Sequence, residues 1–329
     1  MEIDAHLNSN AASHGKFSDN SNLNIVELVS PEQIRDLSGL LDQCFPVPSG
    51  YHFFDDFPIW NPAFSSVNAS RIGIIEQGQL IGAAGVRMAK MHLLSTPKTA
   101  TVAMIGAVAS HPAYRGKGLA SHCVKKAIEW AKTQGAEAAI LWGSEQALYQ
   151  RLGFEMMGHQ CRIPLGEVQL EYSPSSSGRA SSSPSATRVN RGWTPSLFDL
   201  IRQRRSGILL QQDDLGWYSA HRNVKWYYTG SIETPTAYAA FGRGIDLQNC
   251  IHEWGGDAQD LLLIFREVQK EHAGSEVALM GHPIELVRQF RFHSDPLAFV
   301  EYLCMAQVLS PRTSPFPFDR LWFWGLDAA

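Results

Sequence analysis

The chain has 329 residues, roughly twice the usual domain length of about 150, so two domains are expected. Apolar residues make up 44% and charged residues 18% of the sequence, which is ordinary for a globular protein. The formal net charge is −4 and no long basic run occurs, so binding to a nucleic-acid backbone is not favoured.

The five cysteines are scattered, odd in number and never spaced as CxxC, which indicates reduced thiols. The twelve histidines form no HxxxH or HExxH pair, so no metal is expected. No apolar run approaches the roughly 18 residues of a membrane span, and the polar start lacks the apolar core of a secretory signal. We therefore expect a cytoplasmic protein without a membrane partner.

Residues 1–23 are polar and are expected to form a disordered tail. A strand is predicted at 25–29, followed by a helix that Ser30 caps and that Pro31 begins. The helix should end before Pro46. The segment 46–63 then holds four prolines and several aromatic residues, which predicts an ordered, irregular loop.

Strands are predicted at 71–76 and 80–88, joined by the turn Gln77-Gly78-Gln79, and a third strand at 100–109. Apolar periodicity predicts a helix at 119–133 that stops at Gly135. Further elements are predicted as a buried strand at 138–142 and a short helix at 145–152.

A Ser-rich stretch, 173–187, cannot build a core and is interpreted as a flexible linker. Beyond it, the pattern again predicts two strands, a helix and a strand, so the two halves share one order of secondary-structure elements. The elements predicted there are a helix at 194–203, strands at 237–241 and 249–254, a helix from 257, a strand at 277–280, a helix at 284–290, and closing strands at 299–305 and 321–324.

The segment with the clearest chemistry reads Arg115-Gly116-Lys117-Gly118 between a strand and a helix. Glycines allow positive φ and bring main-chain N–H groups close to a ligand. The first turn of a helix has unpaired N–H groups and a partial positive charge, which favour an anion. Such a loop suits a pyrophosphate, although a plain helix-starting turn is also compatible with it.

Two nucleotide-binding motifs do not fit this loop. A dinucleotide fingerprint needs a third glycine, where this chain has Ser121, and an acidic residue at the end of the next strand, whereas Glu137 precedes that strand. The P-loop pattern GxxxxGK[ST] is absent from the sequence.

The pattern Arg-x-x-Gly-x-Ala at Arg115, Gly118 and Ala120 is followed by Tyr-x-x-x-Gly-Phe, which begins at Tyr149. Together these motifs resemble the GNAT superfamily of N-acetyltransferases over residues 24–164. The resemblance implies an α/β (α+β mixed-sheet) GNAT acyl-CoA N-acyltransferase fold, in two tandem copies with the second degenerate. The implied organisation is a tail at 1–23, an acetyl-CoA-binding domain at 24–170, a Ser-rich linker at 171–190 and a second, acceptor-binding domain at 191–329.

The resemblance implies that one strand end holds the thioester carbonyl and that the following loop wraps the pyrophosphate of acetyl-CoA. These coenzyme-binding residues are Val108, Ala109, Ser110, Arg115, Gly116, Lys117, Gly118, Leu119, Ala120 and Ser121. It also implies that Tyr149 points at the thioester sulfur.

The implied reaction is direct attack of a primary amine on the acetyl group through a tetrahedral intermediate. A strand N–H would hold the oxyanion, and Tyr149 would protonate the leaving thiolate. Family members often carry a Glu on the strand before the loop, but residues 103–107 contain no carboxylate. Asp55, Asp56 and His52 remain candidates for the base, as does proton loss through water.

Two other glycine pairs are candidates for a second phosphate site. Gly242-Arg243-Gly244 lies between two predicted strands and is interpreted as a hairpin turn. Gly255-Gly256 precedes a helix but has no basic neighbour, so a second coenzyme site is not expected. His252-Glu253-Trp254 ends a predicted strand and could face an acceptor cleft or simply close the strand.

The apolar carboxyl terminus around Trp322 is expected to be docked. Eis-like two-domain relatives bury their terminus near the active site, which makes Ala329 a candidate to do so. Two functional alternatives stay open: a silent coenzyme A-binding sensor, and a transferase with another acyl donor. The acceptor, a small-molecule or peptide amine, and the oligomeric state are not specified by the sequence.

Overall fold

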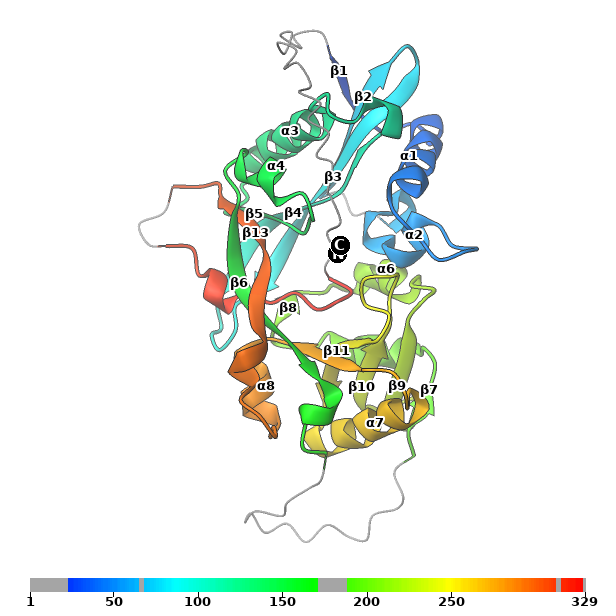
Figure 1. The fold of residues 1–329 in the computed structure, drawn as a ribbon, viewed down its shortest axis with the longest axis vertical. Coiled ribbons are helices and arrows are strands. Elements are labelled where there is room, and N and C mark those ends of the chain that lie inside the picture. Colours follow the sequence, from blue (N-terminus) through cyan, green and yellow to red (C-terminus); the bar gives the residue numbers. More distant parts are fainter. Residues whose placement is uncertain (1–22, 65–67, 171–187, 312–314, 328–329) are drawn as a thin grey trace, which may run out of the picture.

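The computed structural model describes residues 23–64, 68–170, 188–311 and 315–327. These residues form one mixed sheet flanked by helices, with the N-terminal half above the C-terminal half in Figure 1. The predicted tail (1–23) and Ser-rich linker (171–190) lie almost entirely outside the described residues. The strands are β1 Asn24–Glu27, β2 Ala69–Glu76, β3 Gln79–His92, β4 Thr99–Ser110, β5 Ala138–Leu141, β6 Glu155–Pro164, β7 Asn190–Arg191, β8 Gly207–Ile208, β9 Lys225–Gly230, β10 Pro235–Phe241, β11 Cys250–Gly256, β12 Ala278–Gly281 and β13 Val300–Val308.

The helices agree closely with the periodicity of the sequence. Helix α3 has the bounds predicted from apolar spacing, and α1 begins with the capping box of Ser30 and Gln33. Between β2 and β3, Gln77 and Gly78 both have positive φ, as a tight hairpin turn requires. The helices are α1 Pro31–Cys44, α2 Phe53–Asp56, α3 Leu119–Thr133, α4 Gln146–Gln150, α5 Pro195–Ile201, α6 Leu215–Ser219, α7 Ala258–Glu271 and α8 Pro283–Gln289, with a 3₁₀ turn η1 at Pro58–Trp60.

The two halves repeat one topology and exchange their last strands. The order across the middle of the sheet is β4-β5-β13-β6-β12-β11, in which α3 joins parallel β4 and β5, and α7 joins parallel β11 and β12. Strand β13 of the second half pairs antiparallel with β5, while β6 of the first half pairs antiparallel with β12. β6 and β13 also pair with each other, and in Figure 1 they run side by side from one half into the other. Each half therefore completes the sheet of its neighbour.

Strands β4 and β5 are paired over only part of their length. Their parallel register runs from Val102 opposite Ala138 to Ile105 opposite Leu141, after which β4 continues for five residues without β5. The backbones separate at this point. Helices α1 and α2 lie on one side of the separated strand and α3 and α4 on the other (Figure 1).

The separated part of β4 carries a bulge. Gly85 faces Gly106 and Ala83 faces Ala109, so β4 has one extra residue in this interval. Ala107 accordingly has a φ of 50°, and both it and Ala109 face the core on the α1 side. A bulge leaves one residue of the ladder unpaired, so a main-chain N–H becomes available near Val108.

The bulge is backed by the indole of Trp60, which is 5% exposed. A Cβ at Gly85 would lie 2.8 Å from this ring, and a Cβ at Gly106 would also clash with it. The two glycines therefore let the ring of Trp60 lie directly against the sheet.

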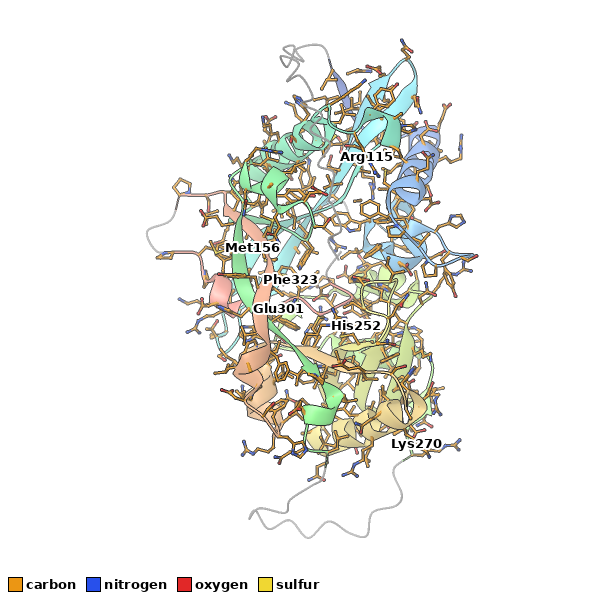
Figure 2. The ribbon with its side chains drawn as sticks, in the orientation of Figure 1. Arg115, Met156, His252, Lys270, Glu301 and Phe323 are labelled. Carbon is orange, nitrogen blue, oxygen red and sulfur yellow. The ribbon has the colours of Figure 1, made fainter. Side chains whose placement is uncertain are left out.

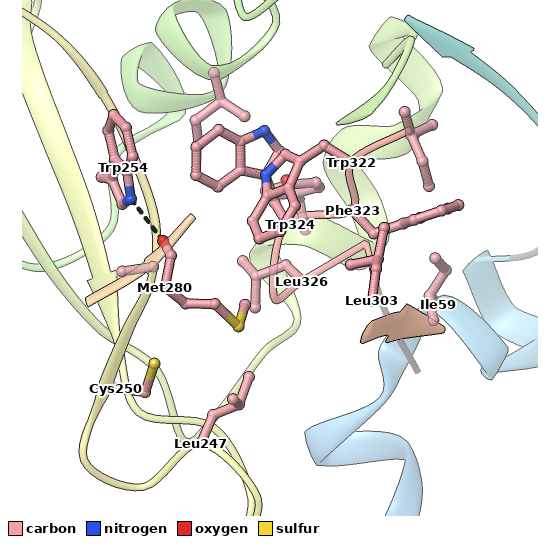
Figure 3. Close-up of a cluster of buried hydrophobic side chains, with 14 of the residues drawn as sticks. Ile59, Leu247, Cys250, Trp254, Met280, Leu303, Trp322, Phe323, Trp324 and Leu326 are labelled. Atoms are coloured by element: carbon pink, nitrogen blue, oxygen red, sulfur yellow. Dashed lines mark hydrogen bonds between the residues drawn. The ribbon is translucent and has the colours of Figure 1, made fainter. Parts of the chain in front are cut away.

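The prediction of a strand at 321–324 is wrong. These residues have no strand pairing, although all four are buried. Trp322, Phe323 and Trp324 fill the space between the halves, next to Trp254 (Figure 3). The ring centres of Trp324 and Trp254 lie 5.2 Å apart, and those of Phe323 and Trp142 lie 4.8 Å apart. A continuous run of large apolar residues is compatible with a buried irregular segment as well as with a buried strand, so the sequence alone does not distinguish the two.

A buried ionic cluster anchors this C-terminal segment. Arg204 donates to both carboxylate oxygens of Asp327, at 2.6 and 2.7 Å, and to Glu253 at 2.8 Å. Tyr218 also donates to Glu253, at 2.8 Å. Burial raises the pKa of Glu253 to about 7, although Arg204 opposes the shift. The guanidinium thus balances two carboxylates that have little contact with water.

We predict that Arg204→Met destabilises the protein by about 3–5 kcal/mol, because both carboxylates are then left buried without a cation. Urea unfolding at pH 7 measures this change. The matched control is Arg202→Met, whose side chain is 34% exposed and whose pair with Asp199 spans 3.9 Å. Equal effects of the two substitutions would contradict the prediction.

Candidate active site

A cavity of about 930 Å³ lies where β4 and β5 separate. This volume is within the range of about 300–1,000 Å³ that is typical of small-molecule sites. Its wall combines the end of β4, the loop into α3, the segment after β5, α4, and the ends of α1 and α2. The lining residues are Cys44, Phe45, Phe53, Phe57, Gly106, Ala107, Val108, Ala109, Ser110, Arg115, Gly116, Gly118, Leu119, Ala120, Ser121, Trp142, Gly143, Ser144, Glu145, Leu148, Tyr149 and Arg151.

The wall at the start of α3 is suited to an anion. Gly116 and Gly118 have φ values of 79° and 77°, and a Cβ on either would meet nothing within 4 Å. Gly118 caps α3 without any side-chain acceptor, so the N–H groups of the first turn keep their capacity to bind a ligand. Arg115, in the upper half of the molecule (Figure 2), also lines the cavity. Burial raises the pKa of the Cys44 thiol at the end of α1, and the charge of Arg115 opposes this larger effect.

Nine of the ten coenzyme-binding residues expected from the sequence line this cavity, and Lys117 does not. The Lys117 ammonium instead lies 4.5 Å from the centre of the Tyr114 ring. Arg151, at the end of α4, is a lining cation that sequence reasoning missed. Arg151 lies four residues after Ala147 at the end of a short helix, and no motif there predicts that it lines a binding site.

Tyr149, on α4, also lines the cavity. Its side chain is 7% exposed and packs against Gly143, where a Cβ would be 2.5 Å from Cε2 of the ring. Burial, and secondly the charge of Glu145, raise the pKa of Tyr149. The phenol therefore stays protonated throughout the neutral range.

An aromatic wall closes the end of the cavity at α1 and α2. We use this term for Phe45, Phe53 and Phe57 together with Trp142. The Phe53 ring centre lies 4.8 Å from those of both Phe45 and Phe57. The neighbouring Cys44 donates its thiol proton to the carbonyl of Ser110 at 3.3 Å, and burial raises its pKa. Cys44 is thus held as a neutral thiol.

None of the three candidate general bases that the sequence suggests lines the cavity. His52 is exposed and pairs with Asp42 at 2.8 Å, and Asp55 faces Arg222 at 3.4 Å. Asp56 is 1% exposed and accepts from Asn223 at 2.6 Å. The lining residues instead include one carboxylate, Glu145, which stands just after the gap between β4 and β5.

The corresponding helix start in the second half is closed. Asp257 accepts from the N–H groups of Gln259 and Asp260, so α7 carries its own anion where α3 has none. A Cβ at Gly256 would also clash with Thr236, so its glycine serves packing. This arrangement leaves no room for a second phosphate site of the same kind.

The remaining glycine loop, Gly242-Arg243-Gly244, connects β10 and β11 as expected, but Arg243 is buried. Its guanidinium lies 4.8 Å from the centre of the Phe57 ring and donates to the carbonyl of Gly325. His252, in the lower half of the molecule (Figure 2), and Glu253 are buried within β11 and are not among the residues that line the cavity. Ala329 lies outside the described residues.

Residues 26–157 match the model of a family described as acetyltransferase (GNAT) domain. This part of the chain belongs to the GNAT acetyltransferase family. The protein is thus an acyltransferase of the GNAT type, and the family uses acetyl-CoA and acetylates amines. No curated protein sequence matched the chain.

Solved structures similar to this chain cover both of its halves. A GCN5-related N-acetyltransferase from Anabaena variabilis has 17% identity and a TM-score of 0.56, over 88% of this chain and 73% of that one. Eis1 from Mycobacterium abscessus has 12% identity and a TM-score of 0.54, over 88% and 74%. A putative acetyltransferase from Pyrococcus horikoshii has 13% identity and a TM-score of 0.52, over 96% and 99%.

At these identities the likeness shows the fold. With the strand exchange, it confirms the predicted mixed α/β fold with two GNAT-like halves. In the described part of the chain, no helix has both the length and the hydropathy to span a bilayer. The same residues include no cluster of three or more His, Cys, Asp or Glu side chains arranged for a metal.

We predict that Gly143→Ala lowers kcat about tenfold or more, because its methyl group would displace the ring of Tyr149 from the cavity wall. Steady-state release of coenzyme A, with acetyl-CoA affinity measured separately, tests this. Gly166→Ala is the control, because a Cβ there meets nothing within 4 Å. An unchanged kcat in Gly143→Ala would contradict the placement of Tyr149.

Proposed function

We propose that the protein is an N-acetyltransferase that moves an acetyl group from acetyl-CoA to a primary amine of a small molecule or peptide. The observation that carries this proposal is the convergence of three features on one cavity. These features are the uncapped start of α3, the β4 bulge and the phenol of Tyr149.

In this proposal the main chain from Arg115 to Ser121 holds the pyrophosphate of acetyl-CoA, with Arg115 and Arg151 adding charge. The pantetheine arm follows the separated end of β4, beside Val108, Ala109 and Ser110. The thioester then lies between the bulge and Tyr149.

The chemistry follows from these positions. A neutral amine attacks the acetyl carbon, and a bulge N–H near Val108 or Ala109 holds the developing oxyanion. Collapse of the tetrahedral intermediate breaks the C–S bond and releases the thiolate, to which Tyr149 donates a hydrogen bond or its proton. Since Cys44 is held as a neutral thiol, transfer through an acylated cysteine is not favoured.

We assign removal of the amine proton to Glu145, directly or through a water. Its carboxylate is on the cavity wall and its charge acts on Tyr149, which places the two groups near each other. An acceptor of protons and a donor of a proton are then available at one reacting centre.

We propose that residues 24–170 form the coenzyme-binding domain and 191–329 the domain that shapes the acceptor side. Three side chains of the second region support this assignment. Arg222 donates a hydrogen bond to Asp55, and Asn223 donates one to Asp56. The guanidinium of Arg243 lies over the ring of Phe57. It touches the cavity indirectly, by fixing the loop that carries the aromatic wall.

Calorimetric titration should detect micromolar binding of acetyl-CoA and no comparable binding of NAD. Gly118→Trp should abolish this binding, because the new side chain both strains a positive φ and occupies the phosphate end of the cavity. Gly135→Trp is the control, since Gly135 also has a positive φ of 78° but does not line the cavity. Failure of the wild type to bind acetyl-CoA would overturn the proposal.

Replacing Tyr149 with Phe should lower kcat about 10²-fold with little change in the affinity for acetyl-CoA, because a proton donor acts mainly in the transition state. The raised pKa of Tyr149 predicts that kcat does not decline between pH 7 and 9 through its ionisation. Stopped-flow release of the thiol measures both quantities. An unaltered kcat in the variant would exclude the assigned role.

A further inference from the structure

The aromatic wall and the coenzyme loop lie on opposite sides of the separated end of β4. Phe53 belongs to the core that includes α1, whereas Leu119 and Tyr149 belong to the core around α3. The β4 bulge lies between the two sides and faces the cavity. With the pyrophosphate at α3 and the thioester at the bulge, the aromatic wall is the surface left for the acceptor.

The aromatic wall carries no ionised side chain. Among the described lining residues, the formal charges are those of Arg115, Arg151 and Glu145, and all three are exposed and belong to the loop before α3 or the ends of α4. Cations outnumber carboxylates there. A second or third ammonium on the acceptor would therefore have no carboxylate partner at the aromatic wall.

The carboxylates nearest in sequence to this wall are already engaged. Asp55 faces Arg222 and caps its own helix, and Asp56 accepts from Asn223 inside the protein. Neither is on the cavity wall. Because both carboxylates are bound by protein groups and lie off the cavity wall, the acceptor side of the cavity remains apolar.

The wall is also held in a fixed shape. The backbone N–H of Phe53 donates to Asp42 at 2.8 Å, which ties α2 to α1. The guanidinium of Arg243 lies over the ring of Phe57, 4.8 Å from its centre. Rings held 4.8 Å apart present a rigid apolar surface to the cavity, and aromatic rings also pack edge to face.

We propose that the acceptor is a monoamine that carries an aromatic ring or a bulky apolar group close to its amino group. This inference rests on the proposed acetyltransferase function. The ring packs on Phe45 and Phe57, and the amine reaches the acetyl carbon at the β4 bulge. Polyamines and aminoglycosides, which carry several ammonium groups, are poor acceptors for this site.

The test compares kcat/KM for 2-phenylethylamine, ethylamine, spermidine and kanamycin at saturating acetyl-CoA. We expect 2-phenylethylamine to exceed each of the other three at least tenfold. Phe57→Ala and Phe45→Leu should each lower kcat/KM for 2-phenylethylamine about tenfold or more, and by a clearly smaller factor for ethylamine, which has no ring to pack on the wall. The control is Phe54→Ala, which removes a ring that packs on Phe53 but does not line the cavity.

Three outcomes would overturn this inference while leaving the acetyltransferase function intact. One is faster acetylation of spermidine or kanamycin, and another is equal losses in Phe57→Ala and Phe54→Ala. The third is a tenfold preference for hexanoyl-CoA over acetyl-CoA that Phe57→Ala removes, because the wall would then hold the acyl chain. Acetyl-CoA binding without acetylation of any amine would instead refute the proposed function, and calorimetry with each variant separates that result from misfolding.

Discussion

The early end of the pairing between β4 and β5 is the constraint on which the site depends. Two parallel strands that stayed hydrogen-bonded to their ends would close the sheet and bury residues 106–110. Because pairing stops at Ile105 and Leu141, β4 keeps unpaired main-chain groups next to a cavity. Trp60 then fills the space behind the bulge, and Tyr149 fills the space beside Gly143. The sides that we propose for the coenzyme and for the acceptor are thus two walls of one gap in the sheet.

The exchange of strands explains why this gap can persist. β13 supplies β5 with an antiparallel partner along its free edge, and β6 does the same for β12. The edge of each half is therefore covered by the other, which removes the exposed strand edges that isolated halves would have. The segment that follows β13 returns between the halves, where Asp327 meets Arg204 and Phe323 packs on Trp142. The second half thereby supports the cavity without lining it.

The two halves also show how one topology can be open or closed to a ligand. Both contain a strand, a helix start and a parallel strand in the same order. At α3 the cap is a glycine with no acceptor, whereas at α7 it is Asp257, whose carboxylate binds the free N–H groups. A carboxylate at this position occupies the place of a phosphate and repels it. The capacity of each helix start to bind an anion therefore differs between the halves because of one capping residue and its neighbours.

The sequence by itself determined the local elements and indicated the family. Apolar spacing defined α3, the turn at Gln77 and Gly78 defined a hairpin, and the motifs around Gly118 and Tyr149 indicated the family. These features depend on residues close together in the chain, so local rules suffice. The tertiary structure decided the exchange of β6 and β13, the buried path of residues 321–327, the turning of Asp55 and Asp56 away from the cavity, and the presence of Glu145 on its wall. Each of these depends on contacts between segments that are far apart in the chain, and the apolar or charged character of a residue does not specify which distant partner it meets.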